Sequence, residues 1–129
     1  MILLPLLLAA ATPLAAAPDC GDQTTQTAMN QCAGREYQAA DAAMNAQWRT
    51  TQAAMKRRGI ANTTRGGGFG YAAALLASQR AWLRFRDAQC VIEGGEYAGG
   101  SLQPFTQARC KTRLTRQRTG QLRALDWTR

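Results

Sequence analysis

Residues 78–90 read SQRAWLRFRDAQC and place an arginine next to the largest aromatic residue of the segment. Arg86 follows Trp82 by four residues and precedes Cys90 by four, so a helix would put all three on neighbouring turns of one face. The stretch lies within a longer segment, 71–97, whose larger side chains recur at steps of three and four, as in an amphipathic helix. This segment predicts a helix with an arginine on the flank of its buried face. The residues expected along that face are Tyr71, Leu75, Ser78, Trp82, Phe85, Gln89 and Ile92, and a neighbouring stripe at steps of seven widens it with Leu76, Leu83, Cys90 and Tyr97.

Two more segments show the same periodicity. The first helix is expected to follow a cap at Asp22 or Thr24 and to end at Gly59, and the last is expected at about 102–126. Their inward residues are Met29, Ala33, Tyr37, Ala40, Met44, Trp48, Thr51 and Met55 in the first segment, and Leu102, Phe105, Cys110, Leu114, Leu122 and Leu125 in the last. Residues 59–70, GIANTTRGGGFG, form a glycine-rich linker. The predicted fold class is therefore all-α, a small antiparallel three-helix bundle stapled by disulfides.

The first residues of the chain have the composition of a leader peptide. Residues 1–16 carry no charged side chain and change from leucine-rich to alanine-rich, which is typical of a secretory signal peptide. Spanning a membrane takes about 20 apolar residues, and Pro5 and Pro13 interrupt this run. We therefore predict a signal peptide at 1–16, one helical domain at 17–129 without a transmembrane segment, and export to the periplasm or the medium.

The cysteines fit an exported protein. There are four of them, Cys20, Cys32, Cys90 and Cys110, and an oxidising compartment favours disulfides. Three pairings are possible. The bundle favours two local bridges, because Cys90 and Cys110 face each other across a helical hairpin and the segment before the first helix can fold back from Cys20 to Cys32. A metal site is not expected, since the chain has no histidine and no closely spaced pair of cysteines.

Polar side chains are expected inside the bundle. Arg86 and Arg118 each lie one turn from core positions, and Asp41 is the carboxylate that best shares the inner face of the first helix, with Asn45 beside it. An unpaired buried guanidinium would cost several kcal/mol, so we expect Asp41 to meet Arg86 or Arg118. In the alternative, both arginines cover apolar surface with their stems and keep their heads in water. Arg84 and Asp87 are expected to form a surface pair.

Four motifs occur in order along the chain. They are M-N-x-C-A-x-x-x-Y-x-x-A-D-x-x-M-N at 29–45, QRAWLRFRDAQC at 79–90, GGS at 99–101 and C-x4-T-x2-R at 110–118. Together they resemble the LprI-type lysozyme inhibitor domain, a family of exported bacterial proteins, and the resemblance covers essentially all of the chain after the leader. It implies a small helical protein with disulfides that inhibits lysozyme.

The turn between the second and third helices is the candidate binding site. It contains Tyr97, Gly99, Gly100 and Ser101, which offer an aromatic anchor and a small hydroxyl on a segment held by a Cys90–Cys110 bridge. In the alternative, these glycines serve only to reverse the chain direction.

The composition favours binding over catalysis. Histidine, the commonest general base, is absent, so no catalytic residue and no cofactor is expected. Two classes remain: a lysozyme inhibitor, and a basic module that binds anionic cell-wall or lipid polymers of the envelope. The net charge of +8 suits the second class and would slow the encounter of the first with a basic enzyme. Nucleic acid is not expected as a partner of an exported protein, and the sequence carries no signal for the oligomeric state.

Overall fold

The computed structural model describes residues 19–61 and 68–127. These residues form three long helices, α1 (Gln26–Ala61), α3 (Tyr71–Gly94) and α4 (Leu102–Ala124), with short 3-10 turns η1 (Cys20–Asp22) and η2 (Gly95–Tyr97) and no strand. The predicted all-α bundle is confirmed. The predicted signal peptide, residues 1–16, and linker residues 62–67 lie outside the described part of the chain.

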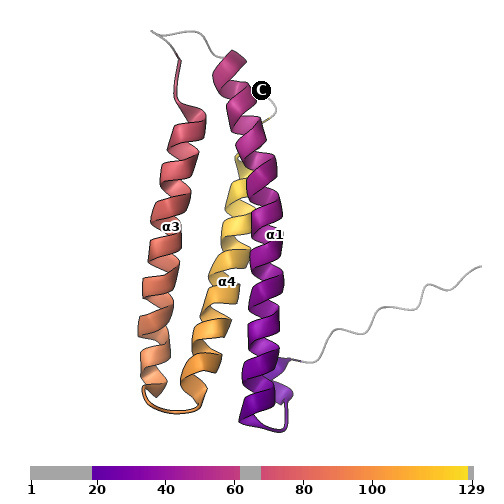
Figure 1. Cartoon of the computed structure of the whole chain (residues 1–129), viewed down its shortest axis with the longest axis vertical. Coiled ribbons are helices and arrows are strands. Elements are labelled where there is room, and N and C mark those ends of the chain that lie inside the picture. The colour runs from indigo at the N-terminus through magenta and orange to yellow at the C-terminus, as the bar shows by residue number, and fades with distance from the viewer. Residues whose placement is uncertain (1–18, 62–67, 128–129) are drawn as a thin grey trace, which may run out of the picture.

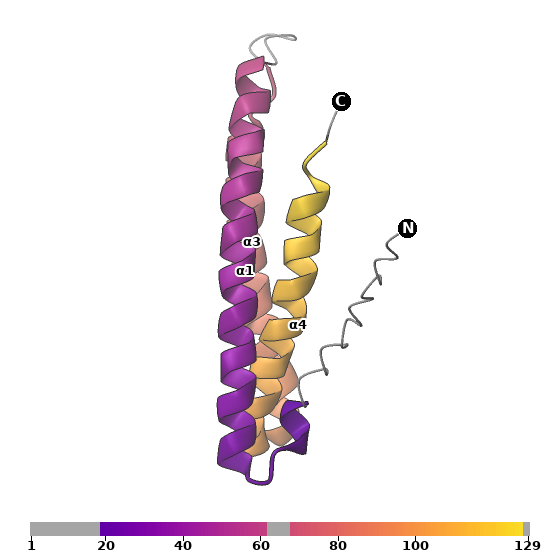
Figure 2. The ribbon, with the colours of Figure 1, turned by 90° about the vertical axis from the view of Figure 1, so that its right-hand side faces the viewer.

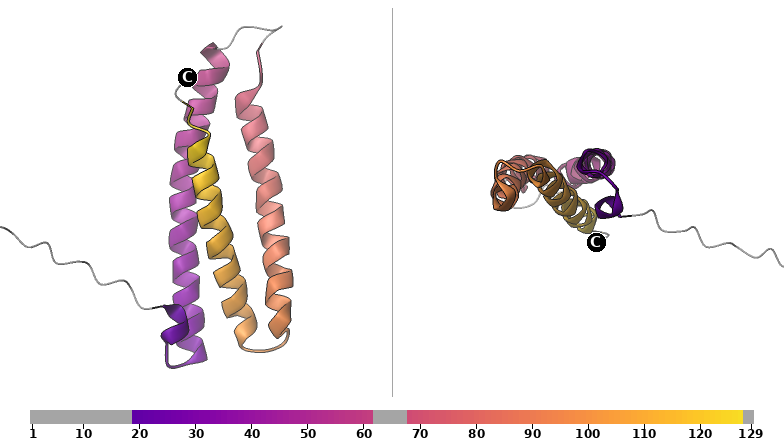
Figure 3. Two further views of the ribbon diagram at one scale, coloured as in Figure 1. Left: turned by 180° about the vertical axis from the view of Figure 1, so that it is seen from behind. Right: turned by 90° about the horizontal axis from the view of Figure 1, so that it is seen from below.

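The three helices lie along one long axis, with α1 and α4 running in one direction and α3 in the other. Figure 1 shows α4 between α1 and α3. Seen from below, α4 crosses the space between α3 and α1 (Figure 3), and η1 lies beside the first turns of α1 (Figure 2). The helix α4 therefore packs on both other helices. No helix of the described ranges combines the length and the apolar character needed to cross a membrane.

The helix ends differ slightly from the expected ones. The cap of α1 is Thr25, whose hydroxyl accepts a hydrogen bond from the Ala28 N–H at 3.1 Å, and not Asp22 or Thr24. Gly59 does not end α1, which continues to Ala61, because a single glycine costs a helix only about 1 kcal/mol. The helix α3 stops at Gly94, and the last predicted turn is the 3-10 turn η2.

The core consists of two apolar clusters joined by Trp82. The smaller cluster surrounds the disulfide between α3 and α4, and the larger one lies further from that disulfide along the bundle. Trp82 packs against both clusters. The buried members of the larger cluster are Met44, Met55, Leu75 and Leu122, and those of the smaller are Cys90, Cys110 and Leu114.

The expected buried face of α3 was wrong at three positions. Ser78, Phe85 and Ile92 are exposed, the last two at 54% and 71%, whereas Gln79, which was not expected in the core, is buried. Arg86 and Cys90 are buried, as the sequence indicated. The periodicity of apolar residues gives the spacing of the buried positions. It does not decide which side of the helix faces the core when polar residues are buried there too. Here the disulfide at Cys90 and the polar contacts of Gln79 and Arg86 set that rotation.

Candidate functional site

Both disulfides lie at the end of the bundle that holds η1 and the α3–α4 turn, at the bottom of Figure 1. Cys20–Cys32 ties η1 to α1 with a Cα–Cα distance of 5.4 Å, and Cys90–Cys110 ties α3 to α4 with a distance of 5.5 Å. These are the two local bridges that the sequence favoured. Cys20, Cys32 and Glu36 lie close enough to share an ion, but sulfurs bonded to each other are not the thiolates that metals require. We call this end the disulfide end.

Ion pairs reinforce the disulfide end. Arg109 of α4 reaches Asp19 at 3.1 Å and Glu36 of α1 at 3.6 Å, and Arg113 reaches Glu93 of α3 at 2.8 Å. Side chains tilt towards the N-terminus of their own helix, so Arg113 and Glu93 lean towards each other along the antiparallel hairpin. These ion pairs were not predicted from the sequence, although the tilt of the side chains was a usable signal for the pair of Arg113 and Glu93.

Two carboxyl groups at this end have lowered pKa values. The pKa of Asp19 is lowered by the hydrogen bond from the Gly21 N–H and then by the charge of Arg109. The pKa of Glu93 is lowered by the hydrogen bond from Gln89 and then by the hydrogen bond from Arg113. Both carboxylates are therefore stabilised in their charged form by the folded structure.

The candidate turn is exposed and its backbone is held in place. Tyr97 is 39% exposed and Ser101 is exposed. Gly99 has a φ of +77°, a conformation that favours glycine, and its N–H donates to the Gln103 side chain at 3.1 Å. The Gly100 N–H donates to the Tyr97 carbonyl at 2.9 Å. The glycine at 99 is therefore required by the backbone, and the turn is fixed by its own hydrogen bonds.

The turn also contacts the first helix. Asn30 of α1 donates to the Ser101 carbonyl at 3.4 Å. At the C-terminus of α3, a Cβ on Gly94 would come 2.4 Å from the Gln107 side chain, so glycine allows α3 and α4 to approach closely just before the turn. The turn is thus supported by all three helices.

The predicted polar residues form two separate groups, one around Arg86 and one around Arg118. Arg86 is 6% exposed and lies between the rings of Tyr37 and Trp82, with its guanidinium carbon 5.4 and 5.3 Å from their centroids. It reaches Asp41 at 3.4 Å and Asp87 at 3.0 Å. Of the two candidates, Arg86 is thus the arginine that meets Asp41. Burial raises the pKa of Tyr37.

Two of the predicted polar contacts differ in detail. Asp87 pairs with Arg86 and not with Arg84, because the Arg86 side chain passes along the helix surface towards its neighbour. Asn45 is exposed and donates to Asp41 at 3.3 Å, so it touches the network from outside the core.

Arg118 is buried against neutral groups. It is 8% exposed, and it donates to Gln79 and Ser78 of α3, each at 2.9 Å. Its guanidinium carbon lies 5.8 Å from the Trp82 ring centroid. No carboxylate contacts it within the described ranges, and burial lowers its pKa. The hydrogen bonds from this arginine to an amide oxygen and a hydroxyl oxygen were not predicted from the sequence.

A hollow of about 630 Å³ lies beside the disulfide end. Its lining includes the paired residues Arg109 and Arg113, and also Arg116. The hydroxyl of Thr112, also in the lining, is buried and has no hydrogen-bond partner among the described residues.

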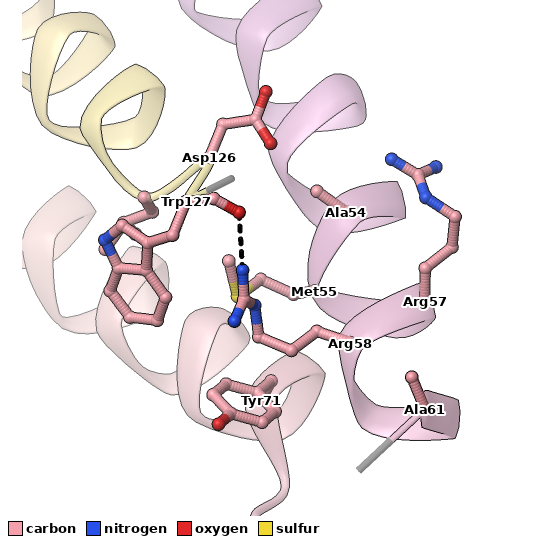
Figure 4. A pocket seen from close by; sticks show the side chains of 9 residues that line it. Ala54, Met55, Arg57, Arg58, Ala61, Tyr71, Asp126 and Trp127 are labelled. Atoms are coloured by element: carbon pink, nitrogen blue, oxygen red, sulfur yellow. Dashed lines mark hydrogen bonds between the residues drawn. The ribbon is translucent and has the colours of Figure 1, made fainter. Parts of the chain in front are cut away.

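A second hollow, of about 470 Å³, lies at the opposite end. Figure 4 shows Arg58 of α1 between Tyr71 and Trp127. Its guanidinium carbon is 5.7 and 5.0 Å from the two ring centroids, and its Nη2 donates to the Trp127 carbonyl at 2.6 Å. Arg58 fills the space between the two rings. We call this the open end.

Comparison with known proteins agrees with the resemblance read from the motifs. Residues 18–122 match the family described as "Lysozyme inhibitor LprI". The chain is also similar to "Uncharacterized protein R02472" of Rhizobium meliloti (strain 1021), with 39% identity over 112 residues that cover 84% of this chain and 78% of the relative. No solved structure shows significant similarity to this chain.

Proposed function

The chain belongs to the lysozyme inhibitor LprI family, and from this premise we propose that it is an exported protein that inhibits a lysozyme by binding to it. The observation that carries the proposal is the exposed turn at residues 97–101, which the Cys90–Cys110 bridge, its own hydrogen bonds and Asn30 hold in place. A turn that is already ordered loses little conformational entropy on binding. The predicted leader peptide and the two disulfides support export.

The charges at the disulfide end remove an objection to this proposal. Animal lysozymes are generally basic, and a net charge of +8 would oppose their approach. Five of the eight acidic residues belong to this end, namely Asp19, Asp22, Glu36, Glu93 and Glu96. Arg109 and Arg113 are paired there. If the protein approaches a lysozyme with the turn in front, the surface that it presents carries acidic and basic side chains in similar number.

The chemistry of the turn suits a glycosidase cleft. Such clefts hold a pair of carboxyl groups, and Tyr97 and Ser101 supply hydroxyl groups that can donate hydrogen bonds to them. Glycines at 99 and 100 keep the turn narrow. The proposed contact needs no reaction on either protein.

The test is inhibition of lysozymes of several types by the mature protein, measured by clearing of a cell-wall suspension at low salt and at about 0.3 M salt. We expect Tyr97→Ala and Ser101→Ala to weaken inhibition, and Phe69→Ala to leave it unchanged. Phe69 is a matched control, since it is 61% exposed and lies at the open end. Equal inhibition by all variants would remove the turn from the site, and failure to inhibit any lysozyme would contradict the proposal.

The second candidate is binding of anionic envelope polymers, and the composition of α4 favours it. This helix carries six basic residues and no acidic one. Arg116 and Arg123 are exposed on it, form no ion pair within the described residues, and line one shallow hollow. Affinity for a polymer would be spread over many arginines and would fall steeply with salt. Binding to isolated cell-wall polymers that is lost at about 0.3 M salt, without lysozyme inhibition, would support this candidate.

A further inference from the structure

Three large apolar side chains are exposed together at the open end. Ile60 lies in the last turn of α1, Phe69 just before α3, and Trp127 just after α4, and they are 80%, 61% and 46% exposed. The ring of Phe69 contacts that of Tyr71 at a centroid distance of 4.9 Å, and one hollow is lined by both Phe69 and Ile60. Arg58 in turn lies between Tyr71 and Trp127. The three side chains therefore belong to one surface, and we call Ile60, Phe69 and Trp127 the open-end patch.

The excess of positive charge lies in the half of the bundle nearer to this patch. The contacts of Arg86 with Asp41 and Thr115 mark a level near the middle of the bundle. Towards the open end from that level there are nine basic residues and one acidic residue, in 42–61, 68–85 and 116–127. Towards the disulfide end there are five basic and seven acidic residues, in 19–41 and 86–115. An anionic surface would therefore attract the molecule with its open end in front.

Basic side chains also lie next to the open-end patch itself. Lys56 and Arg57 are exposed in the last turns of α1, and neither forms an ion pair within the described residues. Figure 4 shows Arg57 and Arg58 on the same stretch of α1, with Arg58 beside Trp127. An anionic polymer in solution would account for these charges but not for the exposed apolar side chains. Aromatic and aliphatic side chains next to Lys and Arg are typical of protein surfaces that lie in the interface of an anionic bilayer.

We propose that the open-end patch binds the surface of an anionic phospholipid bilayer. The three apolar side chains lie at the boundary of headgroups and acyl chains, and Lys56 and Arg57 lie at the headgroup phosphates. Interfacial insertion reaches about 5–10 Å, and each residue of the patch is within three residues of a helix end. The strength of such binding depends on the buried apolar area and on the attraction to anionic lipid. It does not require a rigid surface, which agrees with an end that has no disulfide among the described residues.

A bilayer at the open end leaves the turn at residues 97–101 uncovered. The turn lies at the opposite end of the bundle (Figure 1), and α1, with 36 residues, is about 54 Å long. A molecule attached by its open end therefore presents the turn away from the membrane, towards the cell wall on which a lysozyme acts. This consequence rests on the proposed inhibition of lysozyme, whereas binding to the bilayer does not.

The first test is flotation of the oxidised mature protein with phosphatidylcholine vesicles, with and without about 30% phosphatidylglycerol. We expect binding to the anionic vesicles and little to the neutral ones. Phe69→Ser should weaken this binding at least about fivefold, because less apolar surface enters the interface. Phe85→Ser is the matched control and should leave binding unchanged, since Phe85 is 54% exposed but lies beside Arg86 near the middle of the bundle. No binding to anionic vesicles, equal binding to both kinds, or equal losses in the two variants would overturn the proposal.

Charge reversal on α1 tests the electrostatic part of the binding. Arg57→Glu should weaken binding to the anionic vesicles at least about tenfold, because each basic side chain at such a surface contributes about fivefold. Arg35→Glu is the matched control, since Arg35 is also exposed on α1 and forms no ion pair within the described ranges. It lies about 33 Å away along the helix, well beyond the screening length of about 10 Å at 0.1 M salt. Equal effects of the two reversals would show that net charge alone drives binding and would overturn the proposal.

The fluorescence of Trp127 tests the orientation on the bilayer. Trp48 and Trp82 pack against the core, whereas Trp127 is exposed. Anionic vesicles should shift the tryptophan emission to shorter wavelength as the indole ring of Trp127 leaves water, and Trp127→Phe should remove the shift. A shift that this variant retains would place another part of the molecule in the bilayer and overturn the proposal. None of these measurements uses a lysozyme, so vesicle binding and lysozyme inhibition can fail independently.

Discussion

The two ends of the bundle are closed by different means. At the disulfide end, two covalent bridges and the ion pairs of Arg109 and Arg113 connect η1 and the three helices. At the open end, Arg58 contacts Tyr71 and Trp127 through its guanidinium group and one hydrogen bond. The turn proposed to bind lysozyme lies at the covalently closed end. The contrast suggests that rigidity is concentrated where a binding surface needs it.

Breaking the two disulfides should have the largest effect. Each closes a loop, of 12 residues in one case and 20 in the other, and each should contribute about 3 kcal/mol to the free energy of unfolding. We therefore expect the reduced protein to unfold at a much lower urea concentration than the oxidised one. The comparison of oxidised and reduced urea titrations measures this difference.

The two bridges should not be equivalent. Cys90–Cys110 joins two core helices, whereas Cys20–Cys32 holds only η1 to α1. Replacing both members of the first pair by alanine should destabilise the whole bundle more than replacing the second pair. As a control, alkylation of the unreduced protein should modify no cysteine, and mass spectrometry that finds two alkylated cysteines would contradict the pairing.

The polar layer between the two ends should have the next largest effect. Arg86→Ala would leave a void between Tyr37 and Trp82 and remove the hydrogen bonds to Asp41 and Asp87, at a cost of about 3 kcal/mol in the free energy of unfolding. Arg84 is exposed, and Arg84→Ala should cost less than about 1 kcal/mol. Urea titrations measure both values. If Arg86→Ala and Arg84→Ala both change the free energy of unfolding by the same small amount, Arg86 stabilises the bundle only by covering apolar surface with its stem.

The open end should respond less to the loss of its arginine. Arg58→Ala removes two stacking contacts and one hydrogen bond at a partly exposed site, and we expect a loss of about 1 kcal/mol. Arg57→Ala is the matched control, because Arg57 is an exposed neighbour on the same helix. Hydrogen exchange should show the loosening in the first turns of α3 and not at the disulfide end. Uniform loosening would contradict the separation of the two ends.

The sequence predicted the helices well because their signals are local. The steps of three and four gave α1, α3 and α4 to within a few residues, and the hairpin geometry favoured Cys90–Cys110. The rotation of α3 about its own axis was harder to predict, because Phe85 was expected in the core and is exposed, whereas Gln79 was not expected there and is buried. Hydrophobicity alone could not reveal that Trp82 and Tyr37 provide a stacking site for a buried guanidinium.

The candidate site was only partly predictable, for the same reason. The turn at 97–101 follows from its glycines, which local sequence shows. The ion pairs that support it join residues far apart in the chain, such as Asp19 and Arg109. Their partners depend on how the helices pack, and many arginines compete for few acids. Only the packed bundle selects among those pairs.

The smallest expected effect is a pH dependence of the disulfide end. Folding lowers the pKa of Asp19 and of Glu93, so the stability that these groups contribute is present above their ordinary pKa values and is lost as the pH falls through the lowered ones. Unfolding in urea from about pH 6 to about pH 2 should therefore show a loss of stability at the acid end, beginning below about pH 5. The loss should be modest because the Asp19 side chain is exposed and that of Glu93 is only partly buried, so that water screens both charges. Glu93→Gln removes one of the two carboxyl groups and should lose less stability than the parent protein over the same range. If that variant and the parent protein lose the same amount, the pairing of Glu93 with Arg113 does not stabilise this end of the molecule, and the disulfides and the ion pairs of Arg109 distinguish it from the open end.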